Sequence, residues 1–208
     1  MIKLPNYKIL KRLGSGGMGD VYLAEHTLIK RKVAIKILHP HLTSNKAFIK
    51  RFRKEAELLA SLDHSNIVRL NEYFEHEGGL YLVMEYVEGM QLDDYIKNVS
   101  GLIPEKKLIP LFEQLVSAIG YAHKKKLIHR DIKPSNIIIH DGVIKILDFG
   151  IAKLLTEDHG MTKTGVQVGT VMYMSPEQVN AEEVDLRTDI YSLGVTLFQM
   201  AVGQVPYD

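Results

Sequence analysis

The chain has 208 residues, a formal net charge of +1, 46% hydrophobic and 25% charged residues, and no cysteine. These are ordinary values for one large globular domain or two small lobes, and they exclude disulfides and thiolate metal sites. The near-neutral charge argues against a nucleic-acid partner, and no apolar run reaches the roughly 18 residues of a membrane-spanning helix. Because the start, MIKLPNYKIL, also lacks the apolar core of a signal peptide, the sequence predicts an intracellular, cytoplasmic protein.

The first third of the sequence favours β structure with one helix inserted. Alternating or β-branched runs predict five strands, at residues 7–13, 21–26, 32–38, 67–74 and 80–87. The last two form a hairpin around Gly78-Gly79. Between the third and fourth strands, residues 43–63 change to a helical period, with Thr43 or Ser44 as the expected N-cap.

After Gly89 the pattern becomes mainly helical. Helices are expected at residues 91–99, 104–126 and 188–202, short strands at 137–139 and 143–147, and a Thr- and Gly-rich loop at 149–175. The sequence therefore predicts a β-rich N-terminal lobe at 1–87 and a helical C-terminal lobe at 88–208, joined by a hinge near residues 85–89.

The segment GSGGMGDVYLAEH contains a GxGxxG pattern at Gly14, Gly16 and Gly19. A dinucleotide-binding turn needs a helix after the glycines, whereas DVYLAEH alternates like a strand. A hairpin lid over phosphate groups fits this order better. A glycine-rich turn without any ligand is the alternative at this stage.

Lys36 lies inside the apolar run VAIKIL, on the same predicted face as Ala34 and Leu38. A lysine that points outward is the simpler interpretation, but a cation on an apolar face needs an anionic partner. The predicted helix supplies one, because Glu55 falls in the apolar stripe 48, 52, 55, 59 and 62, whereas Glu57 faces water. We therefore expect a Lys36–Glu55 ion pair.

Two further runs place polar side chains between buried segments. In IHRDIKPSNIII, Asp131 is suited to accept a proton, Lys133 to hold a phosphate, and Asn136 to bind a metal through its amide oxygen. In ILDFG, Asp148 follows an apolar strand and is suited to Mg²⁺. Each motif alone also occurs as an ordinary surface turn.

Together the motifs resemble the protein kinase signature set. They are GSGGMGDV at 14–21, VAIK at 33–36, HRDIKPSN at 129–136, DFG at 148–150, and SPE at 175–177, where the family usually has APE. The resemblance covers residues 7–207 and is greatest to the eukaryotic-like Ser/Thr kinases of bacteria. It implies an α+β, bilobal fold, with an antiparallel sheet plus one helix in the N-lobe and a mainly helical C-lobe. The two lobes would form one catalytic domain.

The resemblance implies a role for each matching residue. Catalysis would depend on four side chains: Asp131, Lys36, Lys133 and Glu55. ATP would contact Gly14, Gly16, Gly19, Val21, Ala34, Lys36, Met84, Glu85, Val87 and Ile138. Mg²⁺, or alternatively Mn²⁺, would be bound by Asn136 and Asp148. An apolar spine would contain Leu59, Leu70, His129 and Phe149.

The resemblance also implies regulation. Arg130, just before Asp131, indicates control by activation-loop phosphorylation, with Thr162 and Thr164 in MTKTG as the expected sites. Thr170 would help to select Ser or Thr acceptors in protein substrates. A solvated loop without modification is the alternative for Thr162 and Thr164.

The family pattern continues with three more helices, whose arginine pairs with the residue at Glu177. The expected helix 188–202 carries apolar residues all round, which predicts burial on every side. We therefore expect an incomplete C-lobe: a fragment, an excised piece, or a chain that self-associates through the surface left by the missing helices. Any membrane tether would lie outside this chain.

Two functions follow from these observations. The first is an active Ser/Thr protein kinase that transfers the γ-phosphoryl group of ATP to protein hydroxyl groups. The alternative is a nucleotide-binding pseudokinase or scaffold that is inactive in this shortened form.

Overall fold

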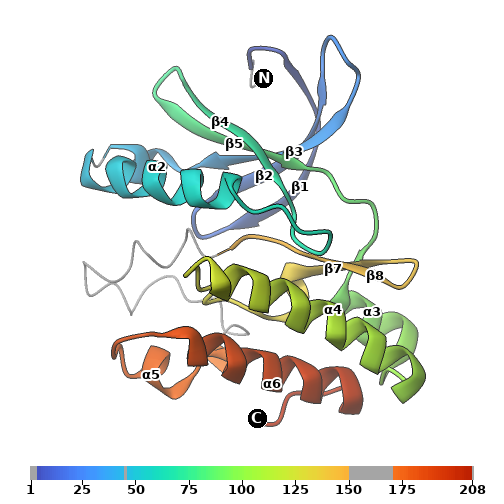
Figure 1. Cartoon of the computed structure of the whole chain (residues 1–208). Helices are drawn as coiled ribbons and strands as arrows, with labels where there is room; N and C mark the ends of the chain where they lie inside the picture. The colour runs from blue at the N-terminus through green and yellow to red at the C-terminus, as the bar shows by residue number, and fades with distance from the viewer. Residues whose placement is uncertain (1–3, 45, 150–170, 208) are drawn as a thin grey trace. The chain divides into compact units, whose positions relative to one another are not determined.

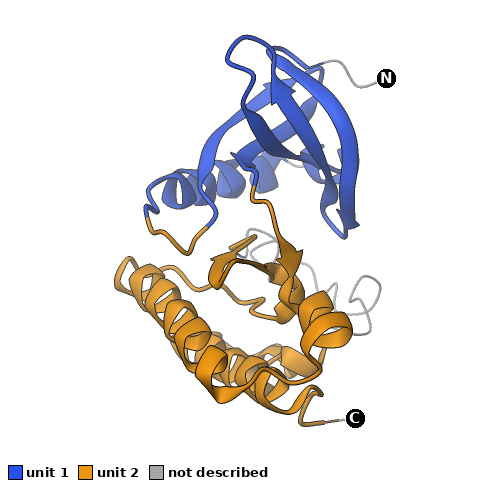
Figure 2. Cartoon of the chain, turned by 90° about the vertical axis from the view of Figure 1, so that its right-hand side faces the viewer, with its two compact units in different colours: residues 1–63, 68–86 blue, residues 64–67, 87–208 orange. Residues whose placement is uncertain are grey.

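The computed structural model describes residues 4–44, 46–149 and 171–207 (Figure 1). The expected loop 149–175 therefore lies largely outside the described residues. The chain divides into two units, residues 1–63 with 68–86 (unit 1) and residues 64–67 with 87–208 (unit 2; Figure 2). Segment 64–67 thus precedes the fourth strand in the sequence but belongs to unit 2.

Unit 1 contains a five-stranded antiparallel sheet with the strand order β1-β2-β3-β5-β4. The strands are β1 (Tyr7–Gly16), β2 (Gly19–His26), β3 (Lys32–Leu38), β4 (Leu70–His76) and β5 (Gly79–Glu85). All five predicted strands are confirmed. The β4–β5 turn consists of Glu77 and Gly78, with φ of 48° and 75°. Two successive positive φ values match the twist of a tight hairpin, so Gly79 begins β5 instead of sharing the turn.

The helix predicted at 43–63 is observed as α2 (Lys46–Ala60), and an additional short helix, α1 (Pro40–Thr43), precedes it. The expected N-cap is wrong, because Thr43 ends α1 and Ser44 caps its C-terminus. Their hydroxyls donate backwards, to Pro40 O at 3.1 Å and to His41 O at 2.9 Å. Proline suits a first helical turn, so Pro40 starts a separate short helix here.

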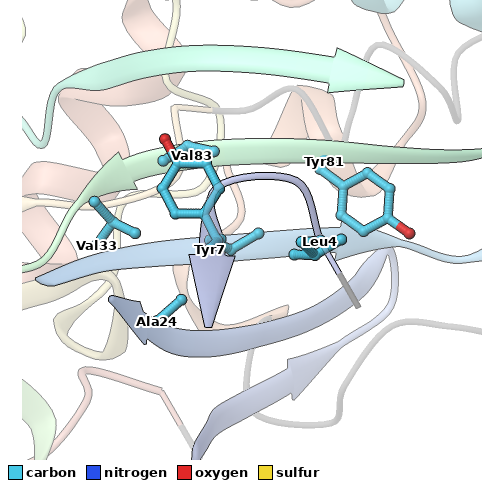
Figure 3. Packing of buried hydrophobic residues seen from close by; sticks show 7 residues of the cluster. Leu4, Tyr7, Ala24, Val33, Tyr81 and Val83 are labelled. Atoms are coloured by element: carbon cyan, nitrogen blue, oxygen red, sulfur yellow. The ribbon is translucent and has the colours of Figure 1, made fainter. Parts of the chain in front are cut away.

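One face of the sheet in unit 1 carries a hydrophobic cluster (Figure 3). Its members are Leu4, Tyr7, Ala24, Val33, Ile35, Tyr81 and Val83. Val33 and Ile35 are fully buried there. Because side chains alternate along a strand, Ala34 and Lys36 lie on the opposite face.

Unit 2 is mainly helical. Its helices are α3 (Leu92–Tyr95), which continues as a π-helical turn (Ile96–Ser100), α4 (Glu105–Lys124), α5 (Pro176–Val179) and α6 (Leu186–Val202). Helices α4 and α6 lie side by side (Figure 1). Among the described residues, no helix has the length and apolarity needed to cross a bilayer.

A three-stranded sheet in unit 2 has the order β6-β7-β8. It consists of β6 (Met90–Gln91), β7 (Ile137–His140) and β8 (Val143–Ile146). The strands β7 and β8 were predicted, whereas β6 was not. These elements and the sheet of unit 1 confirm the expected α+β class.

Asn66 ties segment 64–67 into unit 2. Its amide nitrogen donates to Gln114 Oε1 on α4 and to Ile144 O on β8, both at 2.8 Å. Its carbonyl oxygen accepts from Ile146 N, also at 2.8 Å. Because Asn66 is buried, each of these bonds is shielded from water and costly to lose. They hold strand β8, which leads directly to Asp148.

The final helix, α6, buries several polar residues and exposes several apolar ones, although Leu193, Val195 and Met200 are buried. The buried polar residues are Thr188, Asp189, Ser192, Thr196 and Gln199. Exposed fractions are 61% for Ile190, 40% for Phe198 and 46% for Val202. Apolar side chains therefore do lie on the outer side of α6, and self-association through them stays a prediction.

Candidate functional site

The glycine-rich segment forms the hairpin between β1 and β2. The turn consists of Gly17 and Met18, closed by the pair Gly16–Gly19. A Cβ at Gly19 would lie 2.0 Å from Ile37 O, so glycine is needed there for close contact with β3. At Gly14 a Cβ would meet nothing within 4 Å, and at Gly16 only an oxygen at 4.0 Å. The fold itself therefore does not require glycine at positions 14 and 16.

A polar cluster braces this hairpin. Asp20 accepts a hydrogen bond from Ser15 Oγ at 2.7 Å and from Arg12 Nη2 at 2.5 Å. These two bonds lower the pKa of Asp20 below its usual value, so the carboxylate stays charged at neutral pH. Sequence reasoning missed this cluster, because it depends on a cross-strand register that no motif encodes.

The strand register places the expected nucleotide-contacting residues of unit 1 on one face. Val21 pairs with Lys36 across β2 and β3, and Ala34 pairs with Met84 across β3 and β5. Cross-strand partners share a face, and alternate residues on one strand share it too. Val21, Ala34, Lys36 and Met84 therefore line the face opposite the hydrophobic cluster.

At the end of β5, the backbone N–H group of Glu85 already has a hydrogen-bond partner. The N–H of Glu85 donates to Arg69 O at 2.9 Å. The N–H group of Glu85 is therefore already engaged within unit 1 and is not available to a ligand in the predicted hinge. Val87 follows as the first residue of this part of unit 2.

Lys36 and Glu55 are both half-buried, Lys36 in β3 and Glu55 in α2. Phe48 and Phe52 of the predicted stripe are buried, and Glu57 is exposed as expected. The helix orientation thus agrees with the predicted pattern. The Lys36–Glu55 ion pair itself stays a prediction.

In unit 2, three of the expected site residues come together. Lys133 Nζ lies 3.1 Å from Asp131 Oδ2. The amide nitrogen of Asn136 donates to Asp131 O at 2.8 Å and to Asp131 Oδ2 at 3.0 Å. A 3₁₀ turn at Pro134–Asn136 brings Asn136 back to Asp131. Lys133 and Asn136 therefore both contact the carboxylate of Asp131, and together they orient it.

Asp189 in α6 fixes the backbone before Asp131. Its Oδ1 accepts from Arg130 N at 2.8 Å, and its Oδ2 accepts from His129 N at 2.8 Å and from His123 Nε2 at 2.7 Å. Burial raises the pKa of Asp189, but the hydrogen bonds from His123 and from the N–H groups of His129 and Arg130 lower it more. The net pKa lies below the ordinary value. Sequence analysis assigned Asp189 no role, although a carboxylate in an apolar helix was a usable signal.

His129 connects Asp131 with the Asp-Phe-Gly motif. Its Nδ1 accepts from Asp131 N at 3.2 Å, and its Nε2 donates to Leu147 O at 2.9 Å. Its ring lies 4.6 Å from the ring of Phe149. Two members of the predicted spine, His129 and Phe149, are therefore in contact, and their stacking with Leu59 and Leu70 stays a prediction.

Asp148 and Asn136 supply oxygen atoms of the kind that Mg²⁺ prefers. Asp148 is exposed just after β8, with φ of 44°. Since the amide nitrogen of Asn136 donates to Asp131, its amide oxygen is the atom suited to a metal. The described residues contain no group of three His, Cys, Asp or Glu side chains that could hold a metal ion. Mg²⁺ retains water and shares phosphate oxygens, so it needs few protein ligands. Its binding by Asn136 and Asp148 stays a prediction.

Glu177 has a partner within the described chain. Thr188 Oγ1 donates to Glu177 Oε1 at 2.5 Å, and this bond lowers the pKa of Glu177. In the family pattern, an arginine from three later helices pairs with the residue at this position. Thr162, Thr164 and Thr170 lie outside the described residues.

A sequence model of the protein kinase domain matches residues 7–208. The chain belongs to the protein kinase domain family. This confirms the predicted resemblance, and the fold class agrees with it.

Two curated relatives illustrate the match. The kinase domain is 46% identical over 203 residues to the serine/threonine-protein kinase PrkC of Bacillus subtilis, which covers 97% of this chain and 31% of PrkC. It is 40% identical over 204 residues to the probable serine/threonine-protein kinase PknB of Lactococcus lactis, covering 97% of this chain and 32% of PknB. The chain thus spans about a third of the length of these relatives.

Solved structures show the same fold. The PknI kinase domain of Mycobacterium tuberculosis matches with a TM-score of 0.78 at 28% identity, covering 100% of this chain and 78% of that chain. Rad53 1–466 in complex with AMP-PNP matches with a TM-score of 0.80 at 28% identity, covering 98% of this chain and 50% of that chain.

Proposed function

We propose that the two units together form the catalytic domain of a serine/threonine protein kinase, which transfers the γ-phosphoryl group of ATP to Ser or Thr hydroxyls of proteins. The observation that carries this proposal is the cluster of Asp131, Lys133 and Asn136. Asp189 supports this cluster by accepting hydrogen bonds from the N–H groups of His129 and Arg130, just before Asp131. The names of PrkC and PknB support the Ser/Thr class.

In the proposed reaction Asp131 acts on the acceptor hydroxyl. Its carboxylate orients the hydroxyl and takes its proton while the hydroxyl oxygen bonds to the γ-phosphorus and ADP leaves. Lys133 Nζ, 3.1 Å from this carboxylate, is placed to interact with the transferred phosphoryl group.

The nucleotide would be held mainly by unit 1. Gly14 and Gly16 leave room for close approach of phosphate groups to the backbone. Lys36 would bind the α- and β-phosphates and pair with Glu55. The adenine would lie against Val21, Ala34 and Ile138, next to Met84, with backbone contacts from Glu85 and Val87. The complex of the similar protein Rad53 with AMP-PNP supports nucleotide binding.

Asn136 and Asp148 would hold Mg²⁺, or Mn²⁺ in its place. The bound metal would neutralise the charge that develops on the phosphate oxygens. The chain's own part is to present two oxygen ligands from the segments that flank β7 and β8.

The same proposal has consequences for regulation and for cellular location. Phosphorylation of Thr162 or Thr164 would provide Arg130 with a charged partner, but both sites lie outside the described residues. An enzyme that consumes ATP is expected to work in the cytoplasm, on protein substrates.

The proposal is tested by incubating the chain with Mg²⁺, γ-labelled ATP and a generic protein acceptor. We expect label on Ser and Thr residues, located by mass spectrometry, and loss of labelling when the divalent ions are chelated. ATP binding without any transfer would instead favour the pseudokinase or scaffold.

Substitution of individual glycines in the hairpin should distinguish a glycine that folding requires from one that ligand binding requires. Gly19→Ala should lower the free energy of unfolding by about 1–3 kcal/mol, because the strand must move away from Ile37. Gly16→Ala should leave stability within about 0.5 kcal/mol but weaken ATP binding. Thermal melts and calorimetric titration with ATP measure both effects. Equal destabilisation by the two variants would contradict this assignment.

A further inference from the structure

The peptide group between Arg130 and Asp131 is held at both of its polar atoms. Its carbonyl oxygen accepts from Gln178 Nε2 at 2.9 Å, and its N–H donates to His129 Nδ1 at 3.2 Å. The preceding N–H, of Arg130, donates to Asp189 at 2.8 Å. The N–H groups of Arg130 and Asp131 and the carbonyl group of Arg130 therefore each have a side-chain partner.

These hydrogen bonds hold Arg130 in an unfavourable backbone conformation. Arg130 has φ of 65°, in the left-handed region that residues with a Cβ rarely adopt. Such conformations persist only when their surroundings impose them, and they often occur at catalytic sites. Loss of one partner would let the Arg130–Asp131 peptide rotate towards a more favourable conformation.

The amide of Gln178 has a defined orientation. Gln178 is the third residue of α5, where its Oε1 accepts from Ser175 N at 3.2 Å as half of a capping box. Its Nε2 then points to Arg130 O. Exchanging the two amide atoms would place a donor against Ser175 N and an acceptor against a carbonyl oxygen, so only one orientation satisfies both contacts.

Helix α5 is itself anchored to α6. Ser175 Oγ lies 3.2 Å from Thr188 Oγ1, which also donates to Glu177. Ser175 and Thr188 are fully buried, so water does not compete for this contact. Gln178 thus extends from a helix that is itself anchored. A side chain that positions another group needs such a rigid support.

We propose that Gln178 is a positioning residue for Asp131, acting through the carbonyl oxygen of Arg130. The inference rests on the proposed kinase function. The hydrogen bond fixes the plane of the Arg130–Asp131 peptide and hence the direction of the Asp131 carboxylate relative to Lys133 and Asn136. Misplacing a catalytic group by about 1 Å can cost on the order of 100-fold in rate, so a modest peptide rotation has a measurable effect.

The sharpest test is Gln178→Glu. This variant keeps the chain length and the oxygen that accepts from Ser175 N, but it replaces the donor to Arg130 O by a carboxylate oxygen. We expect kcat to fall by about tenfold or more, with the KM for ATP changed less than about twofold. The matched control is Asn180→Asp, which makes the same amide-to-carboxylate change at an exposed position and should leave kcat unchanged.

A second variant separates positioning from helix capping. Gln178→Met removes both polar contacts, so it should lower kcat as much as Gln178→Glu does and lower the melting temperature further. A purely structural role would instead make kcat follow the folded fraction in both variants. Unchanged kcat in Gln178→Glu, or losses that follow the folded fraction, would overturn the proposal.

Amide hydrogen exchange provides a readout that does not need activity. Exchange at the Asp131 amide should be faster in Gln178→Glu than in the wild-type chain or in Asn180→Asp. If the wild type transfers no phosphate while this exchange still rises, the kinase function fails and the positioning contact stands. If the exchange is unchanged, the positioning role is wrong whatever the activity.

Discussion

Asp131→Asn is expected to lower kcat for phosphoryl transfer by at least about 100-fold. Asparagine has nearly the same shape, but its amide does not accept the proton of the acceptor hydroxyl. It also removes the negative charge that faces Lys133 at 3.1 Å and directs an amide at the Asn136 side chain, which donates to Asp131 Oδ2. Steady-state kinetics with Mg²⁺ and ATP measure the effect.

The matched control for this experiment is Asp141→Asn. Asp141 lies in the β7–β8 turn with 91% of its side chain exposed, and its φ of 47° is one that asparagine tolerates. It should retain wild-type kcat and stability. Equal labelling by Asp131→Asn and the wild type would show that the proposed catalytic role, and with it the kinase activity of this chain, is wrong.

Much of unit 1 was predictable because its strands have one face that must be buried. Alternation in KVAIKIL predicts β3 with its observed bounds and places Lys36 opposite Val33 and Ile35. The helix stripe likewise predicted which of Glu55 and Glu57 would face water. Both predictions depend only on local periodicity, which the backbone geometry enforces.

The elements that the sequence did not predict depend on contacts between distant residues. Strand β6 has two residues, Met90 and Gln91, and exists only because it pairs with β7. The N-cap prediction failed because Pro40 starts a separate turn, which competes for the same hydroxyl groups. Local propensity is a weak guide wherever tertiary pairing decides the outcome.

The residues of the candidate site also divide into those that local motifs predicted and those that depend on contacts between distant residues. Motif spacing identified Asp131, Lys133 and Asn136, which the structure brings together. The residues that orient this cluster, Asp189 and Gln178, lie far along the chain. A motif contains the groups that touch substrate, whereas their supports are selected only for reaching a particular backbone atom.

Asp189→Asn is expected to have the largest effect on stability, lowering the free energy of unfolding by about 2–4 kcal/mol out of a total of roughly 5–15 kcal/mol. The carboxylate accepts three hydrogen bonds, from the N–H groups of His129 and Arg130 and from His123. An amide offers one oxygen and turns an NH₂ group towards the remaining donors. Because Asp189 is fully buried, water does not replace the lost bonds. Denaturant unfolding at neutral pH measures the difference, with the exposed Asp94→Asn as a control expected to stay within about 0.5 kcal/mol.

The pH dependence of this difference provides the decisive check. The pKa of Asp189 is lower in the folded chain than its usual value, so the unfolded state binds a proton at a higher pH than the folded state does. The stabilisation from its ionised form is therefore complete above about pH 4, the unfolded value, and is lost as the pH falls through the folded value. The stability gap between the wild type and Asp189→Asn should consequently be constant from about pH 5 upwards and shrink below about pH 4. A gap that stays the same at low pH would mean that the buried carboxylate contributes through packing and not through its charge.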